Sequence, residues 1–344
     1  MKKILFIVTK SENGGAQKWV KEQVEILKND FEVYIATDEE GWLIQNTKVK
    51  AYLTDKDIKK KFSFLFYLKF LKFIKKNQID LIVASSANAG IYSRLSKLFF
   101  KSKVIYVGHG WSSVYNGGKL TWLYTGIEKY LSYFTESVLC VSESDYDRAK
   151  NIIGIDERKL KLIKNKIIPM KNKQGSAKYS TIKVLSVARF RLPKRVDLLI
   201  AAMKDIDVEL YLVGDGPLLD EYETISNEKV HFLGEVDGFS DFDKYDIFTL
   251  ISDSEGLPLS AIEAMSAGLP LVLSNVGGCP ELIKENGVLV ENNISDISNG
   301  IIECINNIDL YSKNSKNLFD IEFDLMKNKN IYIEYYKEIY EGKR

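Results

Sequence analysis

The chain has 344 residues, a length that suggests about two domains at roughly 150 residues each. Its 48 basic and 47 acidic side chains leave a formal charge of +1, which excludes the strongly basic balance of a general nucleic-acid binder. Hydrophobic residues make up 45% and charged residues 28%, so the chain can build a full core and is not disordered.

Short apolar runs alternate with longer amphipathic segments through the first half of the chain. The runs have the length and composition of buried strands, and their order predicts a parallel sheet covered by helices. The first run is too short for the apolar core of a signal peptide, so we interpret it as a strand. The predicted strands are residues 4–8, 33–36, 81–84, 104–107 and 137–141.

A segment rich in lysines and aromatic residues precedes the third of these strands. It begins at Lys56, ends at Lys76, and holds eight lysines and six aromatic residues. We expect one helix here. Its expected core face consists of Phe62, Phe66, Phe70 and Phe73, which leaves the apolar residues Phe64, Leu68 and Leu71 unexplained. The lysines either cover the outer face of an ordinary core helix or anchor it to an anionic bilayer, and the surplus of apolar residues favours the bilayer.

A polar stretch at 164–183, containing Pro169, Gly175 and Ser176, breaks the alternation and predicts a linker. Strands are predicted again at 184–188, 209–213, 230–233, 247–251 and 270–273. We therefore expect an α/β chain of two Rossmann-like, doubly wound domains, 1–165 and 166–324. A C-terminal helix, 325–344, is expected to cross back toward the first domain. Two such sheets facing each other predict a ligand site in the interdomain cleft.

Two carboxylates bracket a loop that opens a helix in the segment DSEGLPLSAIEAM, 253–265. Glu255 precedes the Gly-Leu-Pro turn, and Glu263 is expected about two turns into the helix. Carboxylates accept hydrogen bonds from hydroxyl groups, so this pair suits two rings of one ligand. The amides at a helix N-terminus suit an anion or a sugar hydroxyl. Helix capping and a solvated helix face remain the alternative.

A cluster of cations follows the first strand after the linker. The chain has only seven arginines, and Arg189, Arg191 and Arg195 fall close together, with Lys194 among them. Arginine offers a planar fork and lysine a point charge, so such a loop suits a diphosphate. A solvated turn is the alternative, but Arg189 directly follows a buried strand and is therefore expected at the cleft.

In this order, these motifs resemble those of retaining glycosyltransferases with the GT-B fold, family 4 (the glycosyltransferase 1 group), over nearly the whole chain. The matching elements are Gly14-Gly15, His109-Gly110, the spacing from Val187 through Arg189 to Lys194, VGDGP at 213–217, the EGLP loop with Glu255 and Glu263, and GGCPELI at 277–283. Two positions depart from the family pattern: Asn165-Lys166 replaces an Asn-Gly pair, and Arg195 replaces a glycine. Arg195 either adds a phosphate contact or faces solvent.

The resemblance implies an enzyme that uses a nucleotide-diphosphate sugar as donor. It assigns Arg189 and Lys194 to the diphosphate, Glu263 to the ribose, and Glu255, Gly256 and Leu257 to the donor sugar. His109, at the end of a strand between two glycines that expose its ring, would contact the sugar or the reaction centre. We therefore take His109, Glu255, Arg189 and Lys194 as the candidate catalytic residues. No metal or other cofactor is expected, because fixed cations stabilise the leaving phosphate.

The glycine pair near the N-terminus and the second histidine are assigned less specific roles. Gly14 and Gly15 lie between the first strand and a helix, where they are expected to let the backbone approach phosphate or acceptor. His231 lies within a strand pattern, and we assign it to structure or to lining of the base pocket. Retention rests on the resemblance alone, since no nucleophile is obvious.

The resemblance also implies a glycan or lipid-linked acceptor in bacterial surface polysaccharide synthesis. Residues 1–165 hold 28 basic and 18 acidic side chains, a balance of +10, whereas 166–344 hold 20 and 29, a balance of −9. The basic half is thus expected to meet the acceptor and an anionic membrane through the segment from Lys56 to Lys76. Widely spaced Cys140, Cys279 and Cys304 favour a reducing compartment. We expect a cytoplasmic enzyme, peripheral at the inner face of the cytoplasmic membrane.

Three other functions remain open for the same architecture. A nucleotide-sugar epimerase or an inverting GT-B transferase requires a catalytic base, which the pairing of carboxylates with Arg189 and Lys194 fits less well. A non-catalytic sugar-binding protein is the alternative from another class. Donor hydrolysis would separate it from an enzyme.

Overall fold

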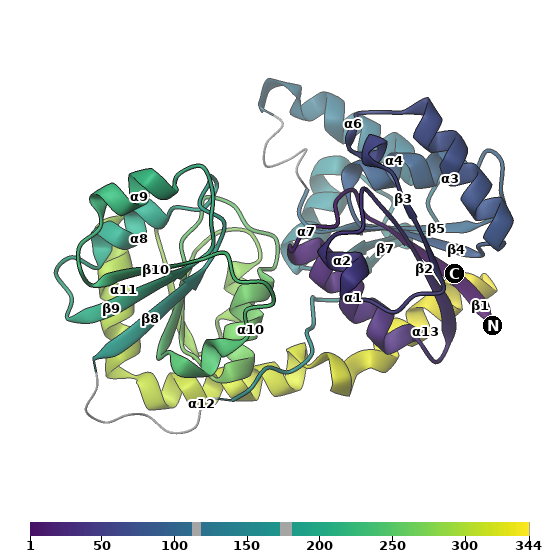
Figure 1. The fold of residues 1–344 in the computed structure, drawn as a ribbon. Coiled ribbons are helices and arrows are strands. Elements are labelled where there is room, and N and C mark those ends of the chain that lie inside the picture. Colours follow the sequence, from purple (N-terminus) through teal and green to yellow (C-terminus); the bar gives the residue numbers. More distant parts are fainter. Residues whose placement is uncertain (112–117, 173–180, 344) are drawn as a thin grey trace. The chain divides into compact units, whose positions relative to one another are not determined.

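The computed structural model describes residues 1–111, 118–172 and 181–343, shown as a ribbon in Figure 1. Contacts divide the chain into two compact units. The N-terminal unit comprises Met1–Asn165 with Asn328–Arg344, and the C-terminal unit comprises Lys166–Lys327. Gly175 and Ser176 of the expected linker lie outside the described residues.

A seven-stranded sheet forms the centre of the N-terminal unit, in the order β3-β2-β1-β4-β5-β6-β7. All its pairs are parallel. The strands are β1 (Lys2–Ile7), β2 (Phe31–Thr37), β3 (Ala51–Thr54), β4 (Leu81–Ala84), β5 (Lys103–Gly108), β6 (Ser137–Cys140) and β7 (Leu160–Leu162). Five confirm the predicted runs. The sequence analysis missed β3 and β7, because these edge strands are mostly half-buried and lack a continuous apolar run.

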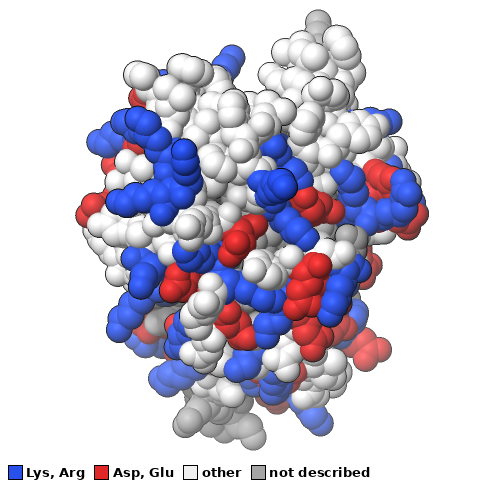
Figure 2. Space-filling view, turned by 90° about the vertical axis from the view of Figure 1, so that its right-hand side faces the viewer, with Lys and Arg blue, Asp and Glu red and all other residues white. Residues whose placement is uncertain are grey.

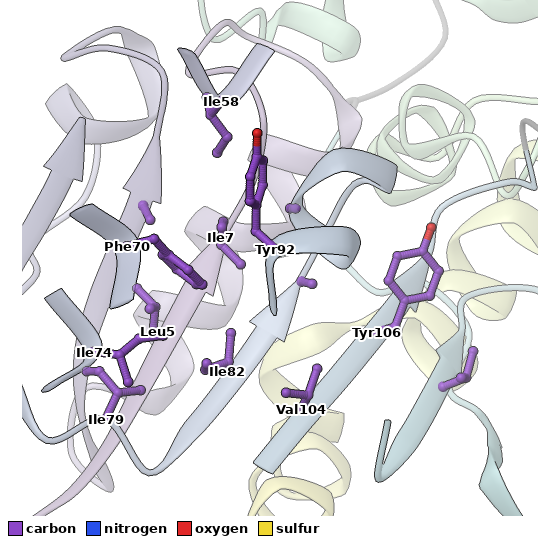
Figure 3. Close-up of a cluster of buried hydrophobic side chains, with 14 of the residues drawn as sticks. Leu5, Ile7, Ile58, Phe70, Ile74, Ile79, Ile82, Tyr92, Val104 and Tyr106 are labelled. Carbon is purple, nitrogen blue, oxygen red and sulfur yellow. The ribbon is translucent and has the colours of Figure 1, made fainter. Parts of the chain in front are cut away.

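Helices cover both faces of this sheet. They are α1 (Gly15–Leu27), α2 (Trp42–Gln45), α3 (Phe64–Asn77), α4 (Ala87–Ser96), α6 (Thr121–Ser132), α7 (Glu143–Arg148) and the C-terminal α13 (Leu325–Glu341). On one face, side chains of α3 and α4 pack with Leu5, Ile7 and Ile82 of the strands (Figure 3). On the other face, the Phe6 ring contacts Trp19 of α1 and Tyr336 of α13.

The lysine-rich segment is not one helix, so that prediction is wrong. A short 3-10 turn covers Lys56–Lys59, and α3 begins only at Phe64, where the Ser63 hydroxyl accepts a hydrogen bond from the Phe66 amide at 3.3 Å. Serine at this position satisfies an amide that would otherwise lack a partner, which favours a helix start here. The core face also differs from the expectation. It consists of Phe66, Tyr67, Phe70 and Ile74, while Phe73 is half-buried and Phe62 is 46% exposed.

The C-terminal unit is built on a six-stranded parallel sheet, in the order β10-β9-β8-β11-β12-β13. Its strands are β8 (Ile182–Val187), β9 (Val208–Val213), β10 (Val230–Gly234), β11 (Ile247–Leu250), β12 (Leu271–Ser274) and β13 (Gly287–Val290). Its helices are α8 (Val196–Ala202), α9 (Leu219–Ile225), α10 (Leu259–Ala267), α11 (Ile294–Asn306) and α12 (Ile308–Leu318). Both sheets are doubly wound, as expected. The sequence analysis missed β13, which is another half-buried edge strand.

The first part of the expected linker is packed and not solvated. Asn165 and Lys166 are buried, and Ile167 belongs to the core of the C-terminal unit. The Ile167 amide donates to the Phe323 carbonyl at 3.0 Å, and its carbonyl accepts from Leu325 at 2.9 Å. These backbone bonds explain how a polar stretch can be buried, because its main-chain groups find partners inside the protein.

The end of the chain packs within the N-terminal unit. The Tyr335 hydroxyl of α13 lies 2.8 Å from the Ser137 hydroxyl, and the Tyr336 hydroxyl donates to Gln23 at 3.0 Å. Both tyrosines are buried, so the aromatic residues at helical spacing near the C-terminus complete the core of this unit. Throughout the described chain, no helix combines the length and the apolar character needed to cross a membrane.

Candidate functional site

The residues expected to bind the donor gather where the strand order of the second sheet reverses. β8 and β11 are neighbours there, and β9 and β12 extend the sheet in opposite directions. Arg189 and Lys194 lie on the loop that follows β8, and Glu255 lies on the loop that follows β11. Loops at such a reversal form the crevice in which open α/β sheets bind ligands. The structure thus brings together residues that are about 60 positions apart in sequence.

Lys194 and Glu255 form an ion pair across this crevice. Their side chains are only 21% and 10% exposed, so both charges are largely removed from water. Backbone bonds hold the two loops together, because the Asp253 amide donates to the Pro193 carbonyl at 2.8 Å. Arg189 is exposed at the start of the first loop. The result is a cation held in a defined position beside a carboxylate, as oriented recognition of a charged ligand requires.

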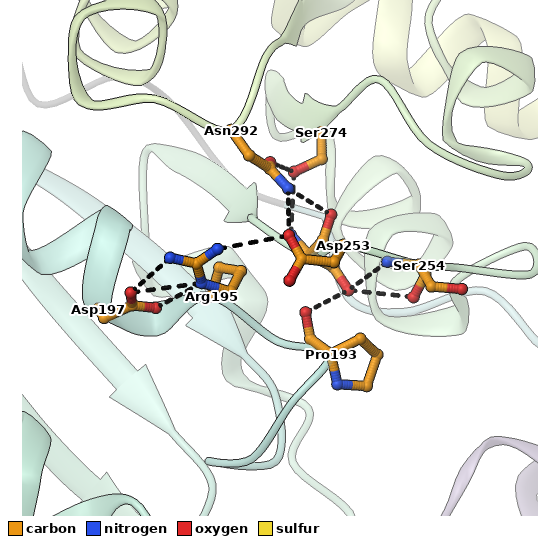
Figure 4. Close-up of polar contacts among 8 residues, drawn as sticks. Pro193, Arg195, Asp197, Asp253, Ser254, Ser274 and Asn292 are labelled. Atoms are coloured by element: carbon orange, nitrogen blue, oxygen red, sulfur yellow. Dashed lines mark hydrogen bonds and ion pairs between the residues drawn. The ribbon is translucent and has the colours of Figure 1, made fainter. Parts of the chain in front are cut away.

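Arg195 is not a solvated residue, and its guanidinium is engaged within the unit (Figure 4). It donates three hydrogen bonds to the Asp197 carboxylate, at 3.0, 3.3 and 2.8 Å, and lies 3.5 Å from the Asp253 carboxylate. Asp253 also accepts from Asn292 at 2.8 Å, and the Asn292 side chain accepts from Ser274 at 2.6 Å. The alternative of a solvent-facing Arg195 is therefore wrong, while a phosphate contact by Arg195 stays a prediction.

The pKa values of this network reflect its hydrogen bonds. The hydrogen bonds from Arg195 lower the pKa of Asp197, even though burial acts in the opposite direction. The Asp197 carboxylate in turn raises the pKa of Arg195. Both groups therefore stay charged at neutral pH, and the loops keep their ionic ties over the physiological range.

Two consecutive glycines pack their backbone directly against the backbone of the Glu255 loop. Gly277 has a φ of +55°, and a Cβ there would lie 1.8 Å from the Glu255 carbonyl oxygen. The Gly278 amide donates to the Gly256 carbonyl at 2.8 Å, and a Cβ on Gly278 would lie 2.4 Å from that oxygen. Sequence analysis identified GGCPELI as a motif but not its task, which is to let one backbone pass directly against another.

The VGDGP motif supports the Arg189 loop in the same way. A Cβ on Gly214 would lie 1.9 Å from the Ala188 carbonyl oxygen, and the Phe190 amide donates to the Asp215 carbonyl at 2.8 Å. Arg189 therefore lies between two residues whose backbones are held by this turn.

Glu263 is closer to the start of its helix than expected. α10 begins at Leu259 after the N-cap Pro258, so Glu263 lies about one turn into the helix and not two. Its side chain is 4% exposed.

The N-terminal unit has its own reversal of strand order, between β1 and β4. Gly14 is the N-cap of α1 and has extended backbone with φ −167°, a conformation that does not require glycine. His109 follows β5, and its Nε2 lies 2.6 Å from the hydroxyl of Ser85, which follows β4. Trp19 of α1 meets the His109 ring edge-on at a centroid distance of 5.2 Å. Sequence analysis missed Ser85 and Trp19, although the place of Ser85 at a strand end is a usable signal.

The His109 ring is neutral at pH 7. It is half-buried, and burial lowers its pKa to about 4. The flanking glycines have a different role from the one expected, since they do not simply expose the imidazole. A Cβ on Gly108 would lie 3.1 Å from the Trp111 ring, and Gly110 has a φ of +99°. The glycines instead allow the chain to turn so that Trp111 is buried, with its indole donating to the Asp145 carbonyl at 2.8 Å.

Two other expected features can be located. His231 lies on β10 and stacks on Tyr211 at 4.6 Å, and its assignment to the base pocket stays a prediction. Within the residues that the structure describes, no group of three or more His, Cys, Asp and Glu side chains is arranged to hold a metal ion.

Comparisons with known proteins agree with this architecture. The family model described as Glycosyltransferase Family 4 matches residues 13–168, and the model for Glycosyl transferases group 1 matches residues 181–307. The O-antigen biosynthesis glycosyltransferase WbnH of Escherichia coli is 46% identical over 300 residues, which cover 86% of this chain and 88% of that protein. The UDP-Gal:alpha-D-GlcNAc-diphosphoundecaprenol alpha-1,3-galactosyltransferase of E. coli is 26% identical over 368 residues, covering 93% and 94%.

A solved structure extends the likeness to the fold of the whole chain. Anabaena Alr3699/HepE, in complex with UDP and glucose, has a TM-score of 0.83 at 18% identity, covering 98% of this chain and 100% of that one. At this identity the likeness supports the fold alone. With two Rossmann-like units, two family models and a relative at 46% identity, this chain belongs to glycosyltransferase family 4, group 1, and is a transferase with the GT-B fold.

Proposed function

We propose that this chain is a retaining glycosyltransferase that moves a sugar from a nucleotide-diphosphate donor to a lipid-linked glycan during synthesis of bacterial surface polysaccharide. The observation that carries the proposal is the ion pair of Lys194 with Glu255 at the strand reversal of the C-terminal unit. Two relatives support it by name: one acts in O-antigen biosynthesis, and the other transfers galactose from UDP-Gal to a sugar on diphosphoundecaprenol.

Donor binding uses the charges of the C-terminal unit. Arg189 and Lys194 bind the diphosphate, and Lys194 exchanges its contact with Glu255 for the phosphate oxygens. Glu255 then turns to the hydroxyls of the donor sugar, together with the backbone of Gly256 and Leu257. Glu263 accepts hydrogen bonds from the ribose. In this scheme the carboxylate holds the lysine ready before the donor arrives, which lowers the cost of ordering it.

Transfer follows a front-face course. The bond from the anomeric carbon to the phosphate oxygen breaks, and the cations stabilise the charge that develops on the leaving diphosphate. The departing phosphate oxygen takes the proton of the acceptor hydroxyl as that oxygen bonds to the same face of the sugar. His109, neutral and held by Ser85, hydrogen-bonds a hydroxyl of the donor sugar. We expect turnover without a metal ion, and unchanged rates in excess chelator test this.

Membrane contact is proposed for the segment from Lys56 to Lys76, at the inner face of the cytoplasmic membrane. Its lysines divide into two groups. Four form ion pairs with nearby carboxylates, namely Lys56, Lys59, Lys60 and Lys69. The other four, Lys61, Lys72, Lys75 and Lys76, are exposed and have no ion pair within the described residues. This second group is the better source of attraction to anionic lipid.

Apolar side chains on the same segment support that contact. Phe64 and Leu65 are 64% and 67% exposed, and Leu68 is 40% exposed. They lie outside the core face of α3, so folding of this unit does not require them. Figure 2 shows one face of the molecule, on which Lys and Arg side chains are interspersed with Asp and Glu over the middle and lower parts while the uppermost part is mostly white.

Three measurements test the proposal. Thermal unfolding with UDP-, GDP- and ADP-sugars identifies the donor, since a specific ligand raises the midpoint with its occupancy. Transfer to a sugar on diphosphoundecaprenol, followed by NMR of the product, tests the reaction, and an inverted anomeric configuration would refute retention. Donor binding without hydrolysis or transfer would favour a sugar-binding protein, and a released epimer would favour an epimerase.

A further inference from the structure

Helix α6 exposes nearly all of its apolar side chains. Of the apolar residues in Thr121–Ser132, Leu131 alone is buried, at 8% exposed. The exposed ones are Trp122 at 72%, Leu123 at 40%, Tyr124 at 44%, Ile127 at 43% and Tyr130 at 63%, and Tyr133 just after the helix is 68% exposed. A continuous exposed apolar surface of this kind is unusual for a protein with no partner.

Five of these six exposed residues form one face of the helix. At about 100° per residue, Trp122, Leu123, Ile127, Tyr130 and Tyr133 fall within an arc of about 140°. Thr125, Glu128 and Leu131 lie on the other side, and Tyr124 falls among them. A helix on a globular domain normally turns its apolar stripe to the core and its charges to water. In α6 the arrangement is reversed.

Its inner face fastens α6 firmly to the N-terminal unit. Glu128 forms an ion pair with Arg94 of α4 at 2.9 Å, and the Arg94 side chain is fully buried beneath it. The Arg94 guanidinium also stacks on the Tyr106 ring at 3.9 Å. At the end of the helix, Lys159 donates to the carbonyls of Ser132 and Tyr133 at 2.8 and 3.2 Å. The exposed face is therefore a stable feature, held by polar contacts on the opposite side.

We propose that the exposed face of α6 inserts into the interfacial region of an anionic bilayer. Trp and Tyr combine an apolar ring with a polar group, which suits the boundary between headgroups and acyl chains. No carboxylate of α6 opposes this, because Glu128, its one acidic residue, is paired inward, while Lys129 is exposed.

A lipid surface fits the charge better than a second copy of this chain does. Residues 1–165 carry a balance of +10, so two copies meeting through α6 would repel one another, whereas anionic lipid attracts each. The inference deepens the proposed function and rests on it in one respect, that the acceptor is held in a membrane. It is separate from the lysines of α3, which act by charge, because α6 acts by burial of apolar rings.

Tryptophan fluorescence tests insertion directly. Trp19 and Trp111 are buried and Trp42 is half-buried, so the exposed Trp122 is the residue whose emission lipid can change most. With vesicles of phosphatidylglycerol and phosphatidylethanolamine, we expect a blue shift of the full chain. Trp122→Phe is expected to lose the shift while it still co-sediments with the vesicles.

Paired substitutions test the binding itself. Trp122→Ser with Tyr130→Ser is expected to weaken vesicle binding by about tenfold or more, since burial of two rings is lost. Ile321→Ser is the matched control, because Ile321 is also 72% exposed but lies in the C-terminal unit, and it should bind as the parent does. An unchanged thermal midpoint shows that each variant is folded.

Two results would overturn the inference. One is vesicle binding by the double variant equal to that of the parent. The other is a dimer of the parent in light scattering that the double variant abolishes, which would assign the face to a second copy. The vesicle and light-scattering assays contain no sugar donor, so their outcome does not depend on whether the proposed transferase activity is correct. Absence of transfer to a water-soluble acceptor would refute the proposed function and leave the vesicle result standing.

Discussion

In both units the candidate residues follow strands at or next to the reversal of strand order, but they are held in different ways. In the C-terminal unit, ion pairs and direct backbone contacts fix the loops, as with Arg195 between Asp197 and Asp253. In the N-terminal unit, His109 is neutral and is held by the Ser85 hydroxyl and an aromatic neighbour. There the buried ion pair of Arg94 with Glu128 fastens α6 to α4.

The difference matches the chemistry that each site is proposed to perform. A diphosphate needs cations fixed in advance, and such cations stay in place only if carboxylates and backbone groups restrain their loops. A sugar hydroxyl carries no charge and can be bound by a neutral imidazole, and burial keeps His109 in that form by lowering its pKa to about 4. Charge is therefore concentrated where the donor is expected and is kept away from His109.

The largest expected effect is on the stability of the N-terminal unit. Glu128→Ala leaves Arg94 buried without its carboxylate, so unfolding should become easier by about 3–5 kcal/mol. Urea denaturation followed by fluorescence measures this. Glu157→Ala removes the exposed partner of Lys150 and serves as the control, with no measurable change expected. Equal stability of both variants would contradict a fastening role for the buried pair.

Loss of the cation in the C-terminal unit should affect activity most. Lys194→Ala is expected to lower kcat/KM about 10²- to 10³-fold, because one fixed charge at the leaving diphosphate is lost. The thermal shift caused by UDP should shrink as well. Arg191→Ala, at an exposed position in the same loop, is the control and should remain close to the parent. Normal donor affinity and rate in Lys194→Ala would show that the phosphate assignment is wrong.

The support of the Glu255 loop can be tested without removing any charge. Gly277→Ala would bring a Cβ against the Glu255 carbonyl at 1.8 Å, so the loop must move, and kcat/KM should fall about tenfold. Gly238→Ala is the matched control, because Gly238 also has a positive φ, +66°, but no atom lies within 4 Å of the added Cβ. If both variants lose the same activity, backbone strain and not loop position is the cause.

The effect that is smallest at neutral pH concerns the protonation of His109. Since burial lowers the pKa of His109 to about 4 from an ordinary value of 6.5, the unfolded chain binds more protons between these two values. The free energy of unfolding should therefore fall as pH drops from 6.5 toward 4. Above pH 6.5 the contribution of His109 to this free energy should not change with pH. His109→Gln should flatten that slope in urea denaturation at several pH values. An unchanged slope would place the histidine in a hydrated environment.

The sequence was most informative where a segment is buried on both sides. The central strands β1, β4 and β11 were predicted from apolar runs alone, because burial on both faces requires such runs. Of the four edge strands, the half-buried β10 was predicted, whereas β3, β7 and β13 were missed because they are short and mostly half-buried. The break between Lys59 and α3 was hidden for a related reason, as lysines and phenylalanines continue through it.

The candidate site was predictable in its residue types but not in its contacts. Strand-end positions together with the family resemblance indicated Arg189, Lys194, Glu255 and His109, whose roles stay predictions. The partner of Arg195, the fit of Gly277 against Glu255, and the role of Ser85 depend on loops that are distant in sequence. Local patterns do not specify which distant backbone a glycine will touch.

By itself the sequence determined the class of fold, the family and the uneven distribution of charge between the two halves of the chain. Periodicity, motif order and composition can all be read without knowing which distant segments meet. Only the tertiary structure decided that Lys194 is paired with Glu255 and that α6 turns its rings to solvent. The apolar pattern of α6 is what a core helix would also show. Which way that face points depends on where Arg94 is buried, since a buried guanidinium requires the carboxylate of Glu128 and so orients the whole helix.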